Sequence, residues 1–86
     1  MKVIMNHELK RIKSGWSART DFLGVGLAAH GYSQEVAQAN LERTIRLFLA
    51  PFKRSGMLEN ELQHLGLSKA TDGQELKQGE LLISLE

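Results

Sequence analysis

The chain has 86 residues, 42% of them hydrophobic, with no cysteine and a formal net charge of +1. This length fits a single domain with a thin core, so self-association would help it to bury more surface. The lack of cysteine excludes disulfides and thiolate metal sites. No apolar run reaches the roughly 18 residues of a membrane span, and the N-terminal residues do not resemble a secretory signal, so we expect a cytoplasmic protein without membrane contact.

The net charge hides an asymmetry along the chain. Residues 1–54 hold nine of the eleven Lys and Arg against four acids, whereas residues 55–86 hold two Lys against six acids. A basic segment can indicate contact with nucleic acid. Small domains commonly mix both signs on one surface, and this is the interpretation that we favour.

The first elements predict a β-hairpin. Val3, Met5 and Leu9 alternate with polar residues, which indicates a strand over about residues 2–11, with Ile4 on the other face and His7 on the apolar side. A turn signal at residues 13–15 precedes a second strand, WSART, at residues 16–20.

A loop and a short third strand follow. The segment DFLGVG at residues 21–26 contains an acid and two glycines, which is typical of a loop. LAAHG at residues 27–31 is a weak strand by composition. Its brevity fits an edge strand, whose free backbone N–H and C=O groups can accept another chain.

An amphipathic helix begins after Ser33, a residue suited to cap the first helical N–H groups. Pro51 should end this helix near Leu49 or kink it, because proline lacks the N–H that would donate to the carbonyl of Leu47. The apolar positions recur at helical spacing and predict packing on a sheet. They are Ala37, Leu41, Ile45, Phe48, Leu49 and Phe52.

The C-terminal third predicts a short helix at residues 57–65 that ends at Gly66, a polar loop, and a closing strand ELLISLE at residues 80–86. The predicted fold class is therefore α+β and two-layered, with the order β-β-β-α-(short α)-β. We expect a mixed four-stranded sheet covered on one face by the main helix. The last strand should lie parallel to the first, because strands that follow a helical crossover usually pair in this way.

The segment from residue 15 to residue 49 has a glycine and an aromatic residue at the start of the second strand, a short loop with glycine, and then a glycine and a serine before an acid, an alanine and an asparagine. These residues are Gly15, Trp16, Gly24, Gly31, Ser33, Glu35, Ala37 and Asn40. In this pattern the segment resembles the N-terminal domain of HicB-type antitoxins and of small stand-alone HicB-like proteins. The resemblance extends over roughly residues 2–67 and implies a partial ribonuclease-H-like fold. After Gly66 only twenty residues remain, too few for the separate DNA-binding domain that HicB antitoxins usually carry, so we expect a single domain over residues 1–86.

No pattern of catalytic or metal-ligating residues stands out. Two-metal nuclease chemistry needs several convergent carboxylates, and the predicted elements do not bring Glu8, Glu35, Glu42 and Glu86 together. The three histidines lack a second ligand at the spacing of an H-x-x-x-H motif. We therefore predict a protein that is not an enzyme and has no metal and no cofactor.

The function predicted from these features is a non-enzymatic, HicB-like protein-binding module that forms a dimer or a larger homo-oligomer. Its predicted interface consists of Trp16, Phe22, Leu27, Ala28 and Ala29. The resemblance implies a second partner, a small basic HicA-like toxin that cleaves RNA, which the chain would block sterically if it is a true antitoxin.

The alternative is a small nucleic-acid-binding protein. It would use the basic hairpin between Lys10 and Arg19, in which cations lie close to one aromatic ring, a combination that can hold a phosphate backbone and stack a base. The candidate contacts are Lys10, Arg11, Lys13 and Arg19.

Overall fold

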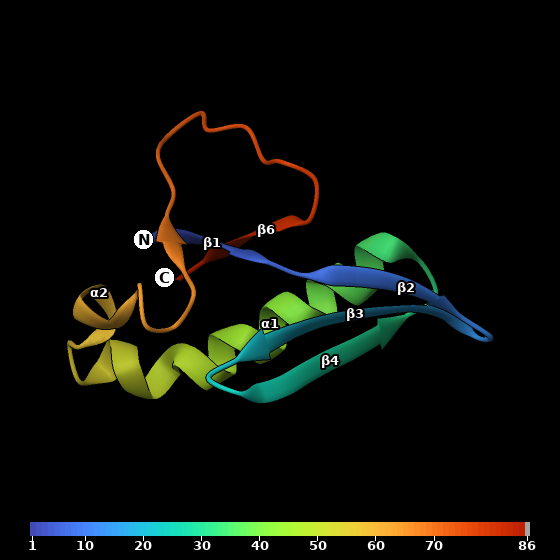
Figure 1. Cartoon of the computed structure of the whole chain (residues 1–86), viewed down its shortest axis with the longest axis horizontal. Helices are drawn as coiled ribbons and strands as arrows, with labels where there is room; N and C mark the ends of the chain where they lie inside the picture. Colours follow the sequence, from blue (N-terminus) through green and yellow to red (C-terminus); the bar gives the residue numbers. More distant parts are fainter. Residues whose placement is uncertain (86) are drawn as a thin grey trace.

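The computed structural model describes residues 1–85 and has an α+β architecture with one main helix (Figure 1). Two three-stranded sheets share this helix, with the strand orders β5-β1-β6 and β2-β3-β4. The elements in chain order are β1 (Lys2–Asn6), β2 (Glu8–Ile12), β3 (Gly15–Phe22), β4 (Val25–Gly31), α1 (Gln34–Arg54), α2 (Leu58–Glu61), β5 (Ser68–Lys69) and β6 (Glu80–Ser84).

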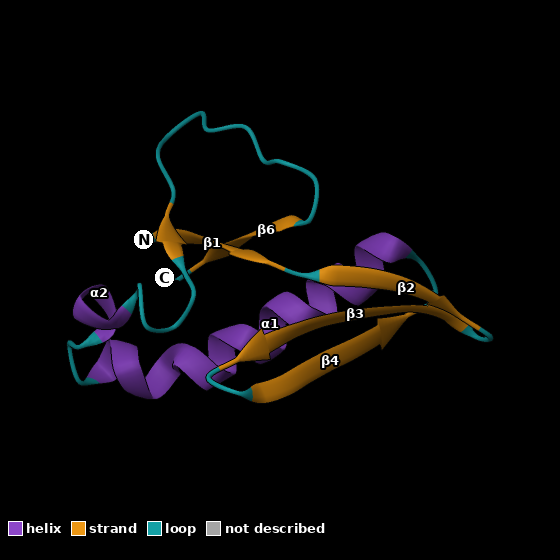
Figure 2. Cartoon of the chain, viewed as in Figure 1, coloured by secondary structure: helices purple, strands orange, loops and turns teal. Residues whose placement is uncertain are grey.

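The expected mixed four-stranded sheet is wrong, because all strand pairs in residues 1–85 are antiparallel. β6 does lie beside β1, as predicted, but its register runs from Lys2↔Ser84 to Asn6↔Glu80. The path of the chain explains the direction. After β5 the chain arches through a long loop to the far end of β1 before β6 begins (Figure 2), so β6 returns antiparallel to β1.

The predicted first strand is divided at His7 into β1 and β2, which belong to different sheets. The backbone N–H of His7 donates to the carbonyl of Gly79 over 2.8 Å. On the other side of the strand, the hydroxyl of Thr20 donates to the carbonyl of Asn6 over 2.8 Å. His7 therefore marks the point where the chain leaves one sheet and enters the other.

The β3–β4 hairpin is longer than the sequence predicts. Residues 21–26 were expected to form a loop, but only Leu23 and Gly24 lie outside the strands. Their φ values of 53° and 78° identify a type I′ turn, whose twist matches that of the flanking strands. Because this turn joins two antiparallel strands directly, pairing continues to Phe22↔Val25.

The main helix begins as predicted, since the backbone N–H of Val36 donates to the hydroxyl of Ser33 over 3.2 Å. It continues through Pro51 to Arg54, so an end near Leu49 is wrong. Pro51 is exposed, and its ring is therefore accommodated on the solvent side of the last helical turn. The second helix is only one turn long, and residues 62–66 continue as turns.

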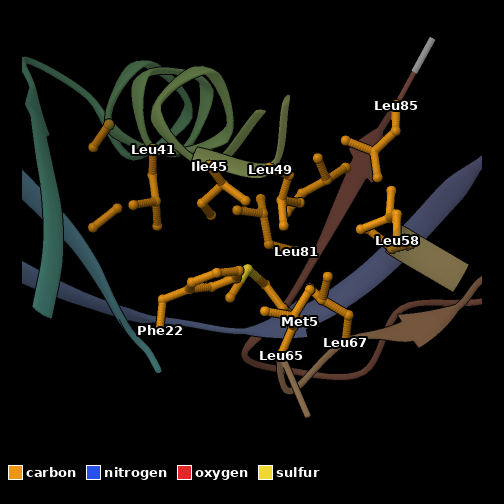
Figure 3. Packing of buried hydrophobic residues seen from close by; sticks show 14 residues of the cluster. Met5, Phe22, Leu41, Ile45, Leu49, Leu58, Leu65, Leu67, Leu81 and Leu85 are labelled. Atoms are coloured by element: carbon orange, nitrogen blue, oxygen red, sulfur yellow. The ribbon is translucent and has the colours of Figure 1, made fainter. Parts of the chain in front are cut away.

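The core lies between α1 and the two sheets (Figure 3). The helix contributes Leu41, Ile45 and Leu49, all fully buried. Phe22 from β3 and Met5 from β1 meet them from the sheet side. A single core thus joins both sheets, which is how a chain of this length obtains one continuous apolar interior. The remaining contributors include Val3, Ala18, Ala37, Leu58, Leu65, Leu67, Leu81, Ile83 and Leu85.

Candidate protein-binding edge

β4 is an edge strand, as the sequence predicts, because within residues 1–85 it pairs with β3 alone. In a hairpin with a two-residue turn, the residues next to the turn exchange both backbone hydrogen bonds, and every second pair along the strands repeats this pattern. Val25, Leu27 and Ala29 therefore bond to β3. Gly26, Ala28 and His30 direct their N–H and C=O groups away from β3, and we call this row of groups the β4 edge.

The outward residues Gly26 and Ala28 lack the sequence devices that commonly protect a sheet edge, and only the His30 end of the strand is covered by Asn40 of α1. Lysine, proline and inward-pointing charges are the usual protection against another chain. The segment Val25–Gly31 contains no charged residue and no proline, and Gly26 and Ala28 are exposed. β2, the opposite edge strand of the same sheet, reads Glu-Leu-Lys-Arg-Ile and has three charged side chains. The two edges of this sheet are therefore chemically different, and β4 is the accessible one.

Asn40 occupies one outward carbonyl of this edge. Its side-chain Nδ2 donates to the backbone carbonyl of His30 over 2.8 Å. The start of α1 lies very close at this end, since a Cβ on Gly31 would stand 2.4 Å from the backbone nitrogen of Ala37. The carbonyl of His30 is thus bonded from the helix, whereas within residues 1–85 no group of α1 donates to the carbonyls of Gly26 and Ala28.

Apolar side chains border the β4 edge near the hairpin turn. Leu23 is 55% exposed and Val25 48% exposed. On the helix, Phe48 packs edge-on against Phe22 with ring centroids 5.0 Å apart, which places it beside the same end of the hairpin. Leu47 follows Asn40 by about two helical turns and therefore shares its side of α1. An added strand at this edge would cover part of this apolar border.

The predicted interface residues divide between the core and the edge. Phe22 is fully buried in the core, so its predicted role as an exposed anchor is wrong. The pattern of β3 explains this, because Phe22 shares the helix-facing side with Ala18 and Thr20. Trp16, Leu27 and Ala29 are half-buried and pack against the core from the same side. Ala28 is exposed on the opposite side, which we call the open face.

The four cations predicted to contact nucleic acid are distributed over two faces. Lys10 and Arg19 lie on the open face, opposite Ser17 and Glu8 respectively. Arg11 lies on the other side, with its guanidinium carbon 5.8 Å from the centre of the Trp16 ring. Lys13 lies in the turn between β2 and β3. The structure therefore does not gather these cations into a single basic surface.

A pocket of about 490 Å³ lies where the two sheets separate. His7 in its wall is held on both ring nitrogens, since Nδ1 lies 2.8 Å from the carbonyl of Gly79 and Nε2 lies 2.9 Å from Nε2 of Gln38. A ring that donates through Nδ1 accepts from the Gln38 amide through Nε2. His7 is thus a structural link between the sheets and α1. The lining residues are Met5, Asn6, His7, Glu8, Arg19, Thr20, Asp21 and Gly66.

Carboxylates and histidines do not cluster in the part of the chain that the structure describes. Among residues 1–85, no group of three or more such side chains could hold a metal ion. Glu42 pairs with Arg46 on the helix over 3.4 Å. Glu86, the fourth carboxylate considered from the sequence, lies outside the described residues. Likewise, none of the helices within residues 1–85 is both long enough and apolar enough to cross a membrane.

No family model matches the chain, and neither a curated protein nor a solved structure matches it. The resemblance to HicB-type antitoxins therefore stays a prediction. The residues that carry it have structural positions in this fold: Gly31 allows the start of α1 to approach the sheet, Ser33 caps the helix, and Ala37 is fully buried.

Two features of the edge were not predicted from the sequence. Asn40 stands on the polar side of an amphipathic pattern, and nothing in that pattern indicates a bond to a strand ten residues earlier. The turn at Leu23 was also missed, because a type I′ turn normally begins with Asn, Asp or Gly rather than with leucine. The glycine that follows, Gly24, was the available signal.

Proposed function

We propose that this chain is a non-enzymatic protein-binding module that forms a homodimer by pairing β4 with β4 of a second copy. The observation that carries the proposal is the β4 edge, where Gly26 and Ala28 present unprotected backbone groups. Addition of a strand to such an edge satisfies these groups with main-chain hydrogen bonds. A dimer of this kind would join two three-stranded sheets into one continuous sheet.

The apolar border of the edge supports the same proposal. Leu23, Val25, Leu47 and Phe48 are all at least 36% exposed in a chain whose core is small. Burial of such side chains contributes roughly 25 cal/mol for each Å² of apolar surface that leaves water. Pairing at β4 would therefore add apolar contact to the main-chain hydrogen bonds.

A second partner follows from the sequence resemblance alone. If the chain is a HicB-like antitoxin, a small basic HicA-like toxin would bind it and be blocked sterically, and the cytoplasm would be the site of action. Nucleic-acid binding receives less support, because Lys10 and Arg19 lie on one face of the hairpin and Arg11 on the other.

The test is a proline at the edge. Ala28→Pro removes an N–H that points away from β3, so the hairpin keeps its ladder while the edge loses a donor. Sedimentation analysis at micromolar concentration should report a dimer for the unmodified chain and a monomer for Ala28→Pro. Ala28→Ser keeps the N–H and is the matched control, which should remain dimeric. A monomeric unmodified chain, or a dimeric Ala28→Pro chain with a native circular-dichroism spectrum, would contradict the proposal.

A further inference from the structure

The backbone groups of the β4 edge also favour one register of β4–β4 pairing. The inference of this register rests on the proposed function. We infer that two copies pair about a two-fold axis at Leu27, so that Gly26 of one copy lies opposite Ala28 of the partner subunit. Asn40 is the residue that selects this register. The argument depends on which backbone groups of the edge are free and on the charges beside them.

Two registers centred near the middle of β4 use the outward groups of this edge. In the first, Ala28 lies opposite Ala28 of the partner subunit, and Gly26 lies opposite His30 of the partner subunit. In the second, the axis passes through Leu27, and Gly26 lies opposite Ala28 of the partner subunit on both sides. Both registers place outward residues in hydrogen-bonded pairs, as antiparallel strands require. The two registers differ in whether they use His30.

The carbonyl of His30 distinguishes between them. The first register needs this carbonyl as an acceptor, but the amide of Asn40 already donates to it over 2.8 Å. The incoming strand would have to share the carbonyl or displace the Asn40 amide. The second register uses the N–H and C=O groups of Gly26 and Ala28 alone, and all four of its hydrogen bonds can form without disturbing α1.

The charges on the open face favour the same register. Arg19 lies opposite Ala28 and Asp21 lies opposite Gly26 in the β3–β4 ladder. An axis at Leu27 places Arg19 in one row with Asp21 of the partner subunit, across only small side chains. An axis at Ala28 places Arg19 in one row with Arg19 of the partner subunit. The two charges would be three strand spacings apart, roughly 14 Å, so their interaction is weak, but its sign agrees with the register that Asn40 selects.

The chain has no cysteine, so single introduced cysteines report the register directly. Gly26→Cys and Ala28→Cys are exposed on the open face, and a Cβ at Gly26 would make only ordinary contacts, 3.7 Å from the Arg19 guanidinium. Directly opposite residues in a hydrogen-bonded pair have Cα atoms about 5.5 Å apart, which suits a disulfide. Diagonal residues are about 7–8 Å apart and do not.

The experiment mixes Gly26→Cys with a tagged Ala28→Cys chain under mild oxidation and compares it with Ala28→Cys alone. The axis at Leu27 predicts that the mixed disulfide forms several-fold faster than the Ala28→Cys homodimer. Ala39→Cys, exposed on α1, measures random collision. A faster Ala28→Cys homodimer overturns the inferred register while leaving β4 pairing intact. If every cysteine variant crosslinks only at the collision rate, pairing at β4 itself is wrong.

The role of Asn40 has its own test. Asn40→Ala releases the carbonyl of His30, and the Ala28→Cys homodimer should then gain relative to the mixed disulfide. Asn40→Gln is the companion variant, because it keeps an amide on a longer arm. An unchanged ratio in Asn40→Ala, in chains whose circular dichroism shows a native fold, would overturn the assignment of Asn40 as the register-selecting residue.

Discussion

The two sheets of this protein differ in how far apart in the sequence their paired strands lie. In the β2-β3-β4 sheet, each strand pairs with a neighbour in sequence through a short turn. In the β5-β1-β6 sheet, β1 pairs with strands from the opposite end of the chain, such as Lys2↔Ser84. The β2-β3-β4 sheet is therefore specified by local turns and close fits, whereas the β5-β1-β6 sheet depends on the shared core and on the long loop before β6.

Close approaches between backbone segments occur at two glycines of the β2-β3-β4 sheet. A Cβ on Gly15 would lie 2.3 Å from the carbonyl oxygen of Gly31, and a Cβ on Gly31 would lie 2.4 Å from the nitrogen of Ala37. In the loop before β6, a Cβ on Gly73 would meet nothing within 4 Å. The comparison teaches that backbone contacts require glycine near the start of α1, whereas at Gly73 the left-handed φ of 74° favours glycine although no atom lies close.

The largest expected effect comes from the core that joins the two sheets. Ile83 in β6 is fully buried, and Ile83→Ala should destabilise the protein by about 2–5 kcal/mol, from the lost apolar contact and the cavity that remains. Leu82 alternates with it, is 36% exposed, and serves as the control in Leu82→Ala. Denaturant titration followed by circular dichroism measures both variants.

The same titration tests whether the sheets unfold together. Because Ile83 and Phe22 belong to one core cluster, Ile83→Ala should shift a single transition. Two separate transitions, with only one of them displaced by the substitution, would mean that the sheets are independent units. In that case the contrast between local and long-range sheets would extend to their stability.

The next largest loss of stability is expected at Gly31, where the start of α1 lies close to β4. Gly31→Ala places a methyl group against the helix backbone and should cost roughly 1–3 kcal/mol, the usual range for an overpacked site. Gly26→Ala is the matched change in the same strand, where the nearest atom to the new Cβ is 3.7 Å away. Thermal unfolding should separate the two variants clearly. Equal stabilities would show that the backbone adjusts at Gly31 without strain.

A smaller effect is expected at the junction of the sheets. His7→Phe keeps an aromatic ring but removes the two side-chain bonds, to the Gly79 carbonyl and to the Gln38 amide, and should cost about 1–2 kcal/mol. The backbone bond from residue 7 to Gly79 remains. His64 is exposed and pairs with Glu61 over 3.0 Å on the surface, so His64→Phe is the control. A destabilisation that is the same in both variants would mean that the two bonds to His7 contribute nothing beyond a surface contact.

The division between local and long-range contacts also separates what the sequence predicted from what it did not. Local signals predicted the Ser33 cap, the apolar stripe through Ile45 and the edge position of β4, because each depends on neighbouring residues. The direction of β6 was predicted wrongly, because it depends on where a long polar loop delivers the chain and no local pattern records that.

The candidate site shows the same limit. Ala28 and Ala29 were placed correctly on an edge strand, since small residues in a short strand indicate one. Phe22 was assigned to the surface because its segment was interpreted as a loop, and the unrecognised two-residue turn extends β3 to include it. The bond from Asn40 to His30 depends on how the helix lies across the strand, which periodicity does not specify.

The smallest expected effect concerns the turn that creates the β4 edge. Leu23 has a φ of 53°, a left-handed conformation that costs a non-glycine residue about 1–2 kcal/mol. Asparagine tolerates this conformation and is preferred in type I′ turns, so Leu23→Asn should stabilise the monomer by about 1 kcal/mol. Leu23 is also 55% exposed on the apolar border of the edge, so the same change should weaken the proposed dimer. Thermal unfolding at low concentration and sedimentation at high concentration measure the two effects separately. A variant that gains stability and dimerises unchanged would place Leu23 outside the interface. A gain in monomer stability together with weaker dimerisation would show that a strained turn is retained here for binding.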